Sequence, residues 1–310
     1  MENQETLGIT DLFMLLIILI WAINFSFIKI ALEEFNPLAF NGIRMAFASI
    51  ILVLVLFITK QGLKVPKKDI WKLVILGIIG NTVYQLLFIH GINLTTASNT
   101  SIIMAMTPAS VALLSLLFKH EKIHWAAWLG IALSFVGFYL VIAKQPGTFV
   151  FSWENLRGDL MIFCGNLVWA VYTVFSKPLL GRITPLKWSA LTLAVGTVLY
   201  LPFCVPAFSR QDFRQISFKA WAILAFSGIF ALAVSYVVWY ASVKRVGNSK
   251  TVIYGNVLPI FAVIFAYIFI AERIGFWQAV GALIILAGVY LTRSGYRFFS
   301  ARGNRHKGDI

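Results

Sequence analysis

Residues 108–140, PASVALLSLLFKHEKIHWAAWLGIALSFVGFYL, and residues 259–291, PIFAVIFAYIFIAERIGFWQAVGALIILAGVYL, are two versions of one pattern and decide the fold. Each stretch has a proline, then a glutamate, then two glycines seven residues apart. Upstream, the likeness continues in pairs 148 residues apart: Asp11 with Asp159, Trp21 with Trp169, Lys29 with Lys177 and Pro37 with Pro185. Two similar halves in one apolar chain are typical of transporters built from repeats around a central site.

Composition places the chain in a membrane. Of its 310 residues, 60% are hydrophobic and 12% are charged, whereas about a quarter of the residues of a soluble domain are charged. A membrane-spanning helix needs about 20 mostly apolar residues. Ten stretches qualify: 11–31, 37–58, 71–91, 95–118, 124–143, 158–180, 185–206, 219–242, 246–270 and 275–293. The sequence therefore predicts an all-α polytopic membrane protein with ten transmembrane helices.

The halves are expected to have opposite orientations, because five spans separate equivalent positions. The first five-helix repeat would be 11–143 and the second, inverted repeat 158–293, with 1–10 and 294–310 as cytoplasmic tails. Lys and Arg fit this topology: eighteen lie on the cytoplasmic side and six on the other. The net charge of +14 is thus explained by membrane topology rather than by nucleic-acid binding. We expect the bacterial inner (plasma) membrane, with both termini in the cytoplasm.

The paired segments 97–141 and 247–292 resemble the EamA-type family of the drug/metabolite transporter superfamily. The resemblance covers about 11–293. It implies an inverted-repeat fold whose central cavity is lined mainly by spans 1, 3, 4, 6, 8 and 9. It also implies movement of small metabolites, often outward, and many relatives are assigned to the export of amino acids or other metabolites.

Polar and aromatic residues at helical spacing predict the walls of a cavity, because lipid disfavours such stripes. Hydrogen bonds between helices would explain any single member as well. Amides, hydroxyls and rings suit a zwitterionic or uncharged polar solute with an apolar part, such as an aromatic amino acid. The candidate substrate-binding residues are Asn24, Asn81, Tyr84, Gln85, Asn99, Trp169, Tyr172, Thr173, Tyr236, Trp239, Tyr240 and Tyr254.

Pro108 and Pro259 lie near the middle of two spans and predict a hinge or gate. Each proline removes the backbone donor that would bond to the carbonyl four residues earlier, at Met104 and Gly255. In hydrocarbon, a free carbonyl is tolerated only where protein or a wet cavity satisfies it. A static kink that serves packing is the alternative interpretation.

Few charged groups lie within the spans. Arg44 is expected to extend to the outer headgroups or to bond to a carbonyl.

All twelve acids lie away from the middle of the spans, so His90 is the candidate for proton coupling, with an interfacial cap as the alternative. A facilitator that follows the substrate gradient or the membrane potential is the simpler mechanism. Lys250 is explained as a cytoplasmic positive residue.

Residues 120–124, HEKIH, offer an enzymatic alternative, an intramembrane zinc hydrolase that would use His120, Glu121 and His124. Against it, the motif lies between two spans, and its counterpart, Ala271 to Gly275, keeps the glutamate but no histidine. The glutamates are expected to cap the following helices or to pair with a neighbouring cation.

The sequence thus favours a secondary transporter over an enzyme, with no cofactor and no metal. Its expected partners are a small-molecule substrate and the lipid bilayer, with a homodimer possible through the glycine faces of the fifth and tenth spans. A membrane scaffold or sensor that kept the fold but lost transport is the third alternative. The identity of the substrate, the direction of transport and any coupling ion stay open.

Overall fold

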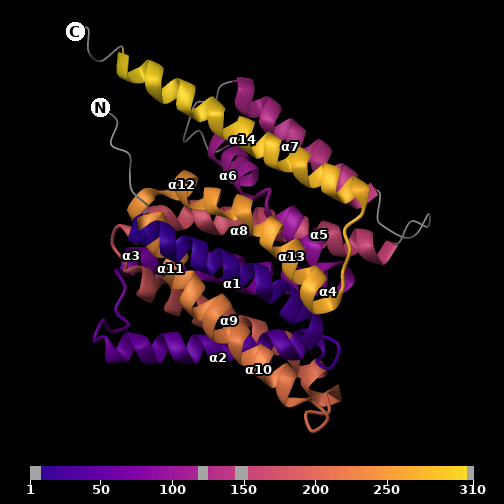
Figure 1. The fold of residues 1–310 in the computed structure, drawn as a ribbon. Coiled ribbons are helices and arrows are strands. Elements are labelled where there is room, and N and C mark those ends of the chain that lie inside the picture. The colour runs from indigo at the N-terminus through magenta and orange to yellow at the C-terminus, as the bar shows by residue number, and fades with distance from the viewer. Residues whose placement is uncertain (1–7, 118–124, 144–152, 306–310) are drawn as a thin grey trace.

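The computed structural model describes residues 8–117, 125–143 and 153–305, and all regular elements in these residues are helical (Figure 1). The first half contains α1 (Ile9–Ala31), α2 (Pro37–Ile58), α3 (Lys67–Gly77), η1 (Ile78–Val83), α4 (Tyr84–Leu94), α5 (Ala97–Met104), α6 (Thr107–Leu117) and α7 (Trp125–Ala143). The second contains α8 (Trp153–Leu180), α9 (Pro185–Arg210), α10 (Phe218–Phe226), η2 (Ser227–Val234), α11 (Ser235–Val246), α12 (Asn248–Ile253), η3 (Tyr254–Val257), α13 (Leu258–Ile270) and α14 (Phe276–Arg305).

Eight helical segments of this part of the chain are long and apolar enough to cross a membrane. Consecutive elements join into single segments, such as Lys67–Leu94 and Phe218–Val246. The remaining two expected spans correspond to α7 and α14, whose apolar parts, Trp128–Ile142 and Phe276–Thr292, are shorter. The all-helical membrane fold is confirmed, while the predicted start of the sixth span at 158 is too late by five residues.

Several helices begin at a side-chain cap, which explains where the chain turns. The amide oxygen of Asn36 accepts the Leu38 N–H, and the hydroxyl of Thr184 accepts the Lys187 N–H. A proline follows each cap as the first helical residue, where its missing N–H costs nothing. These equivalent starts give α2 and α9 similar positions in the two halves.

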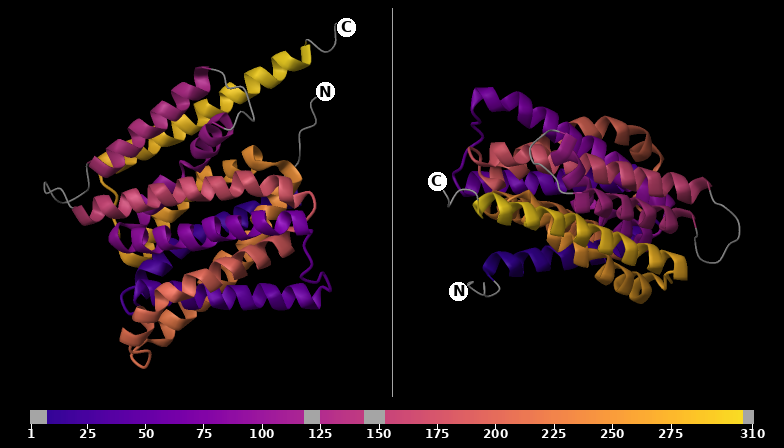
Figure 2. Two further views of the ribbon diagram at one scale, coloured as in Figure 1. Left: turned by 180° about the vertical axis from the view of Figure 1, so that it is seen from behind. Right: turned by 90° about the horizontal axis from the view of Figure 1, so that it is seen from above.

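Helices α7 and α14 form one edge of the molecule, and α2 lies at the opposite edge (Figures 1 and 2). Glycines bring the backbones of α7 and α14 together. A Cβ added at Gly137 would lie 2.7 Å from the Gly281 carbonyl oxygen, and one added at Gly288 would lie 2.6 Å from the Gly130 oxygen. The predicted close packing through these glycines is therefore present within the chain.

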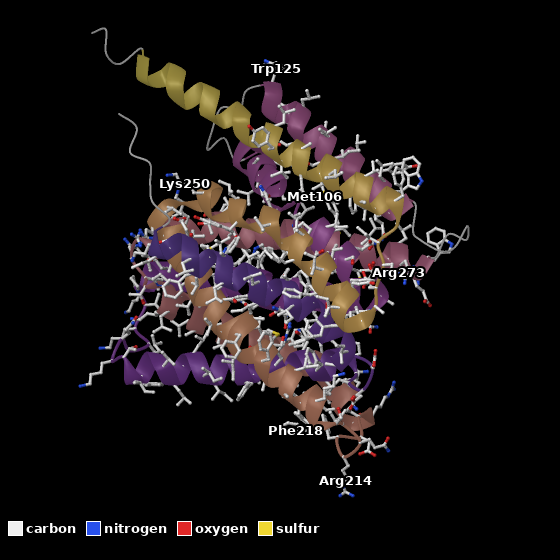
Figure 3. The ribbon with its side chains drawn as sticks, in the orientation of Figure 1. Met106, Trp125, Arg214, Phe218, Lys250 and Arg273 are labelled. Carbon is white, nitrogen blue, oxygen red and sulfur yellow. The ribbon has the colours of Figure 1, made fainter. Side chains whose placement is uncertain are left out.

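Basic side chains lie at both ends of the bundle (Figure 3). Lys250 lies at the end where α14 finishes, whereas Arg214 and Arg273 lie at the opposite end. Large apolar side chains on the outer helix faces are exposed, including Phe57, Val198 and Tyr290. Such exposure suits contact with lipid rather than with water.

Glu272 has a different role from the one that we expected. Its carboxylate accepts the Ala97 and Ser98 N–H groups at 3.0 and 2.8 Å, so it caps the start of α5 rather than the helix that follows it. An acidic side chain is favourable there because the amino end of a helix carries partial positive charge. Its counterpart Glu121 lies outside the described residues.

Candidate functional site

A cavity lies among the middle parts of the helices. Both halves of the chain contribute to its wall. The six spans implied by the family resemblance all line it, and α2 adds Arg44. The lining residues are Ile18, Trp21, Asn24, Phe25, Arg44, Tyr84, Gln85, Phe88, Met104, Thr107, Trp169, Ala231, Leu232, Tyr236, Trp239, Val252, Gly255 and Leu258.

Aromatic rings make most of one wall, with Trp169 of α8 at their centre. Its ring centroid lies 5.1 Å from that of Tyr84, 5.3 Å from Tyr236 and 6.0 Å from Trp239. Trp21 of α1 completes the group at 6.3 Å from Trp169 and 5.3 Å from Trp239. These rings could stack on an apolar or aromatic part of a solute.

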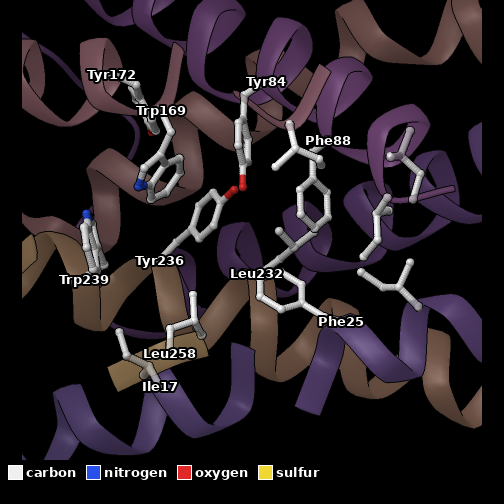
Figure 4. Packing of buried hydrophobic residues seen from close by; sticks show 14 of the residues in the cluster. Ile17, Phe25, Tyr84, Phe88, Trp169, Tyr172, Leu232, Tyr236, Trp239 and Leu258 are labelled. Atoms are coloured by element: carbon white, nitrogen blue, oxygen red, sulfur yellow. The ribbon is translucent and has the colours of Figure 1, made fainter. Parts of the chain in front are cut away.

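The hydroxyl ends of Tyr84 and Tyr236 point toward one another across the cavity (Figure 4). Phe88 and Phe25 lie on one side of this pair, and Trp169 and Trp239 lie on the other (Figure 4). The cavity thus has polar groups in the middle of an aromatic surround, an arrangement that can orient a bound solute.

The π-helical segments η1 and η2 position the polar residues. Tyr84 and Gln85 follow η1 directly, and Ser235 and Tyr236 follow η2. A π-helical turn leaves some carbonyls without the usual partner, and here side chains supply donors: the Trp21 indole N–H bonds to the Ala231 oxygen at 2.9 Å. Such segments are frequent at functional sites, but nothing in the residue pattern predicted them.

Arg44 corrects the sequence-based expectation. Its side chain is 1% exposed, so the prediction that it reaches the headgroups is wrong. The guanidinium donates to Ser227 Oγ at 2.9 Å, to Asn41 Oδ1 at 2.5 Å and to Gln85 Oε1 at 2.9 Å. The wall of the cavity therefore includes one buried cation beside the amides, hydroxyls and rings that the sequence predicted.

The signal for a buried Arg44 was present in the sequence. Asn41 lies one turn before it on the same side of α2, and Ser49 lies five residues after it on a neighbouring face, so polar side chains recur along the helix. In the structure all three are buried, and Ser49 bonds to Thr197 of α9 at 2.8 Å. A polar stripe on a span indicates a face turned toward protein, which leaves an arginine in that stripe no route to the headgroups.

The chain breaks its helices at the two predicted hinges. Pro108 is the second residue of α6, after a turn at Ala105 and Met106, and Pro259 is the second residue of α13, after the 3₁₀ turn η3. The Met104 carbonyl accepts the Thr107 hydroxyl at 2.6 Å and the Asn166 amide at 3.2 Å. The Gly255 carbonyl accepts the Leu258 N–H. Both Met104 and Gly255 line the cavity.

The other candidate residues are not part of the cavity wall. Asn81, Tyr172, Thr173 and Tyr240 are fully buried behind it, where Tyr172 bonds to Thr192 at 2.6 Å. His90 is half-buried near the end of α4. The cavity is lined by these predicted residues: Asn24, Tyr84, Gln85, Trp169, Tyr236, Trp239, Met104 and Gly255.

Asn99 and Tyr254 instead belong to two polar clusters, each built on an equivalent aspartate. Asp159 is fully buried in α8 and accepts Thr95 Oγ1 at 2.5 Å and Asn99 Nδ2 at 3.2 Å. Asp11 in α1 accepts the hydroxyl of Tyr254. Each cluster joins the first helix of one half to the fourth span of the other half.

Metal ligation has no support among the residues that the structure describes, since no group of three His, Cys, Asp or Glu gathers there. The HEKIH motif, with His120, Glu121 and His124, lies outside these residues.

Apolar helices that surround a cavity with aromatic and polar side chains are an arrangement expected of a helical membrane transporter. Comparison with known proteins agrees. The chain belongs to the EamA-like transporter family, whose model matches residues 8–143 and 156–294.

Similar proteins are named as transporters. An uncharacterized transporter of Archaeoglobus fulgidus is 32% identical over 91% of this chain and 96% of its own length. An uncharacterized transporter of Bacillus subtilis is 28% identical over 88% and 89%. A probable terminal-alkyne amino-acid exporter of Streptantibioticus cattleyicolor is 26% identical over 90% and 91%. A crystal structure aligns over 92% of this chain and 96% of its own with a TM-score of 0.67 and 16% identity, which shows the fold alone.

Proposed function

We propose that this protein is a secondary transporter that exports or equilibrates a small metabolite, an amino acid or a similar polar or aromatic solute, by alternating access. One observation carries the proposal. Residues from both halves line one cavity midway along the helices, with aromatic walls and a polar centre. Binding at the junction of two halves lets a relative movement of those halves expose the site to either side.

The chemistry of the wall supports the substrate class. Tryptophan and tyrosine rings favour an apolar or aromatic portion, while Gln85, Asn24 and the tyrosine hydroxyls offer hydrogen bonds. The probable amino-acid exporter among the similar proteins is consistent with such a solute.

Contacts between equivalent residues support two inverted repeats of five spans each. Trp21 contacts its counterpart Trp169, and Ser49 bonds to its counterpart Thr197 at 2.8 Å. A residue contacts its own two-fold equivalent only near the symmetry axis. Away from the axis, a contact between two residues is repeated between their two equivalents. The glycines of α7 and α14 show such a repeated contact, because Gly130 contacts Gly288 and their equivalents, Gly281 and Gly137, contact each other.

The polar clusters support alternating access, since each ties helices together beyond one end of the cavity. Opening on one side would separate Asp159 and Asn99, and opening on the other would separate Asp11 and Tyr254. The breaks before Pro108 and Pro259 lie at the level of the cavity, which is lined by residues on both sides of each break. Small backbone changes there can tilt the outer half of a helix. The carbonyls of Met104 and Gly255 would face the substrate path.

The excess of Lys and Arg on one side of the predicted topology, eighteen against six, supports a place in the inner membrane with both termini in the cytoplasm. The end of the bundle that carries Lys250 and the end of α14 would face inward, and the end with Arg214 and Arg273 would face outward. This topology could be tested by labelling single cysteines introduced at Lys250 and Arg273 in intact cells.

The test of function is counterflow in proteoliposomes. Purified protein would be reconstituted and preloaded with a panel of unlabelled amino acids, aromatic acids, amines and nucleosides, and uptake of labelled solutes would be followed with and without a pH gradient. We expect saturable counterflow of an amino acid or aromatic solute. The proposal fails if no solute in the panel moves faster than in protein-free liposomes, an outcome that would favour a scaffold or sensor.

A further inference from the structure

Arg44 is a buried cation without a counter-ion. Within residues 8–117, 125–143 and 153–305, an ion pair joins Arg182 to Asp69. In the same part of the chain, no carboxylate forms an ion pair with Arg44. Its hydrogen-bond partners are the uncharged side chains of Ser227, Asn41 and Gln85. A buried charge without an opposite charge is costly, so its retention at the wall of a cavity indicates a function.

The guanidinium still has donors to offer. Three of the five N–H donors of a guanidinium are engaged here, all of them on Nη1 and Nη2. Nε is buried and has no hydrogen-bond partner. A carboxylate is the anion whose two oxygens match adjacent N–H donors of arginine.

The surroundings of Arg44 hold the guanidinium in place while leaving its partners free to change. The guanidinium carbon lies 5.6 Å from the ring centroid of Phe40 and 6.0 Å from that of Phe88. Gln85, whose amide donates to Tyr236 Oη at 3.0 Å, also lines the cavity. Rotation of this amide would let a ligand oxygen replace Gln85 Oε1 without breaking the bonds to Ser227 and Asn41.

Two further buried atoms without a partner lie in the same wall. Trp239 Nε1 is a donor and Asn24 Oδ1 is an acceptor, and both residues line the cavity. Asn24 Oδ1 can accept a hydrogen bond from an uncharged or ammonium N–H of the ligand, whereas the Arg44 guanidinium can bind its anionic group. The wall therefore offers opposite chemistry to the two ends of a zwitterion.

We propose that Arg44 is the residue that selects the substrate of this transporter, by binding one carboxylate of the solute through its guanidinium. The inference rests on the proposed transport function and narrows it to monocarboxylates, amino acids included. With a single cation in the described wall, a dianion such as a phosphate ester would be left half neutralised. A cationic drug would be repelled.

The experiment compares four probes that share one ring: phenylalanine, 3-phenylpropionate, phenethylamine and phenylalaninamide. Binding to purified protein would be followed by tryptophan fluorescence, since Trp21, Trp169 and Trp239 line the cavity, and each probe would also be tested as an inhibitor of counterflow. We expect the two carboxylates to bind about ten- to hundredfold more tightly than the amine and the amide.

Arg44→Gln should abolish that difference, and Arg44→Lys should keep part of it. Because removal of Arg44 could disturb folding, Gln85→Glu serves as a second variant. It places a carboxylate next to the Arg44 guanidinium and keeps a side chain of nearly the same size at position 85. It should remove the preference for carboxylates. Lys250→Gln, which removes a positive charge at the exposed start of α12, is the matched control and should leave the preference unchanged.

The outcomes separate this inference from the proposed function. If the wild type counterflows a solute but amine and amide probes compete as well as the carboxylates, transport stands and the role of Arg44 is refuted. If no solute moves at all, the proposed function fails first. If chloride alone gives the Arg44-dependent fluorescence change and carboxylates do not compete with it, an inorganic anion occupies the site and the inference is overturned.

Discussion

The carboxylate of Asp159 accepts hydrogen bonds from the side-chain amide of Asn99 through both of its oxygens, each at 3.2 Å. The two residues come from different helices, α8 and α5, and both are fully buried. Gln278 of α14 donates to Asn99 Oδ1 at 2.5 Å and extends the cluster to a third helix. One buried acid thus links three helices at this end of the molecule. The sequence had indicated only that no acid lies in the middle of a span.

Replacing Asp159 with Asn should lower the stability of this end. An amide has one acceptor oxygen in place of two, and its NH₂ group would face the donors of Thr95 and Asn99. We expect a loss of about 1–3 kcal/mol, because buried donors would lose their acceptor. Thermal unfolding in detergent measures the change. Asp11→Asn at the half-exposed equivalent position is the control, and an equal loss there would contradict the importance of burial.

A methyl group at Gly137 should force α7 away from α14. The added Cβ would lie 2.7 Å from the carbonyl oxygen of Gly281, which is backbone and cannot rotate away. Gly137→Ala is therefore expected to cost about 1–3 kcal/mol. Gly255→Ala is the matched control, because no heavy atom lies within 4 Å of a Cβ at that position. Similar unfolding temperatures for the two variants would argue against the observed helix contact.

The ring of Trp169 should be required for transport. It contacts Trp21, Tyr84, Tyr236 and Trp239, so Trp169→Ala would remove the centre of the aromatic wall. We expect at least about a tenfold loss in transport efficiency, with partial recovery in Trp169→Phe. Trp71→Phe, at a side chain 71% exposed on α3, should have no effect. Full activity of Trp169→Ala would refute the proposed binding wall.

The contact between Glu34 and Ser217 should depend on pH. The backbone N–H of Ser217 and then its hydroxyl donate to the carboxylate at 2.6 and 2.7 Å, which holds the pKa of Glu34 below its ordinary value of 4.5. A lowered pKa in the folded state means that the contact stabilises fully above the ordinary value and is lost as pH falls through the lowered one.

We therefore expect amide exchange at Ser217, the cap of α10, to accelerate in the wild type as pH falls through the lowered pKa of Glu34, after correction for the intrinsic pH dependence of exchange. Glu34→Gln should exchange at the faster rate at pH 7 already and show no such transition. The effect on global stability should be small because Glu34 is exposed. A transition that persists in Glu34→Gln would assign it to another group.

The positions of the helices could be read from the sequence because lipid imposes strict rules on composition. Apolar runs of span length locate the segments, and the twin proline and glycine positions show which segments correspond. The limits at 31, 37, 58, 143, 180, 185 and 270 agree with the structure. Helix starts such as Trp153 were missed, because polar and charged residues continue a helix beyond the apolar part.

The side of each helix that faces the cavity was only partly predictable. Tyr84, Gln85, Trp169, Tyr236 and Trp239 line it, as their spacing suggested, but Tyr172 and Tyr240 share those stripes and lie behind the wall. A stripe spans about two turns, and the packing of neighbouring helices decides which turn reaches the cavity. The π-helical segments also rotate the following residues, and they have no clear sequence signal.

By itself, the sequence determined that this chain is a helical membrane protein of two similar halves, because hydrophobicity and internal likeness act along the chain and need no knowledge of neighbours. Only the tertiary structure decided that Arg44 is an interior cation, that Asp159 organises one end, and which aromatic rings meet at the cavity. The reason is physical: the cost of a buried charge and the direction of a side chain depend on what other helices bring to that place, and those partners lie tens to hundreds of residues away.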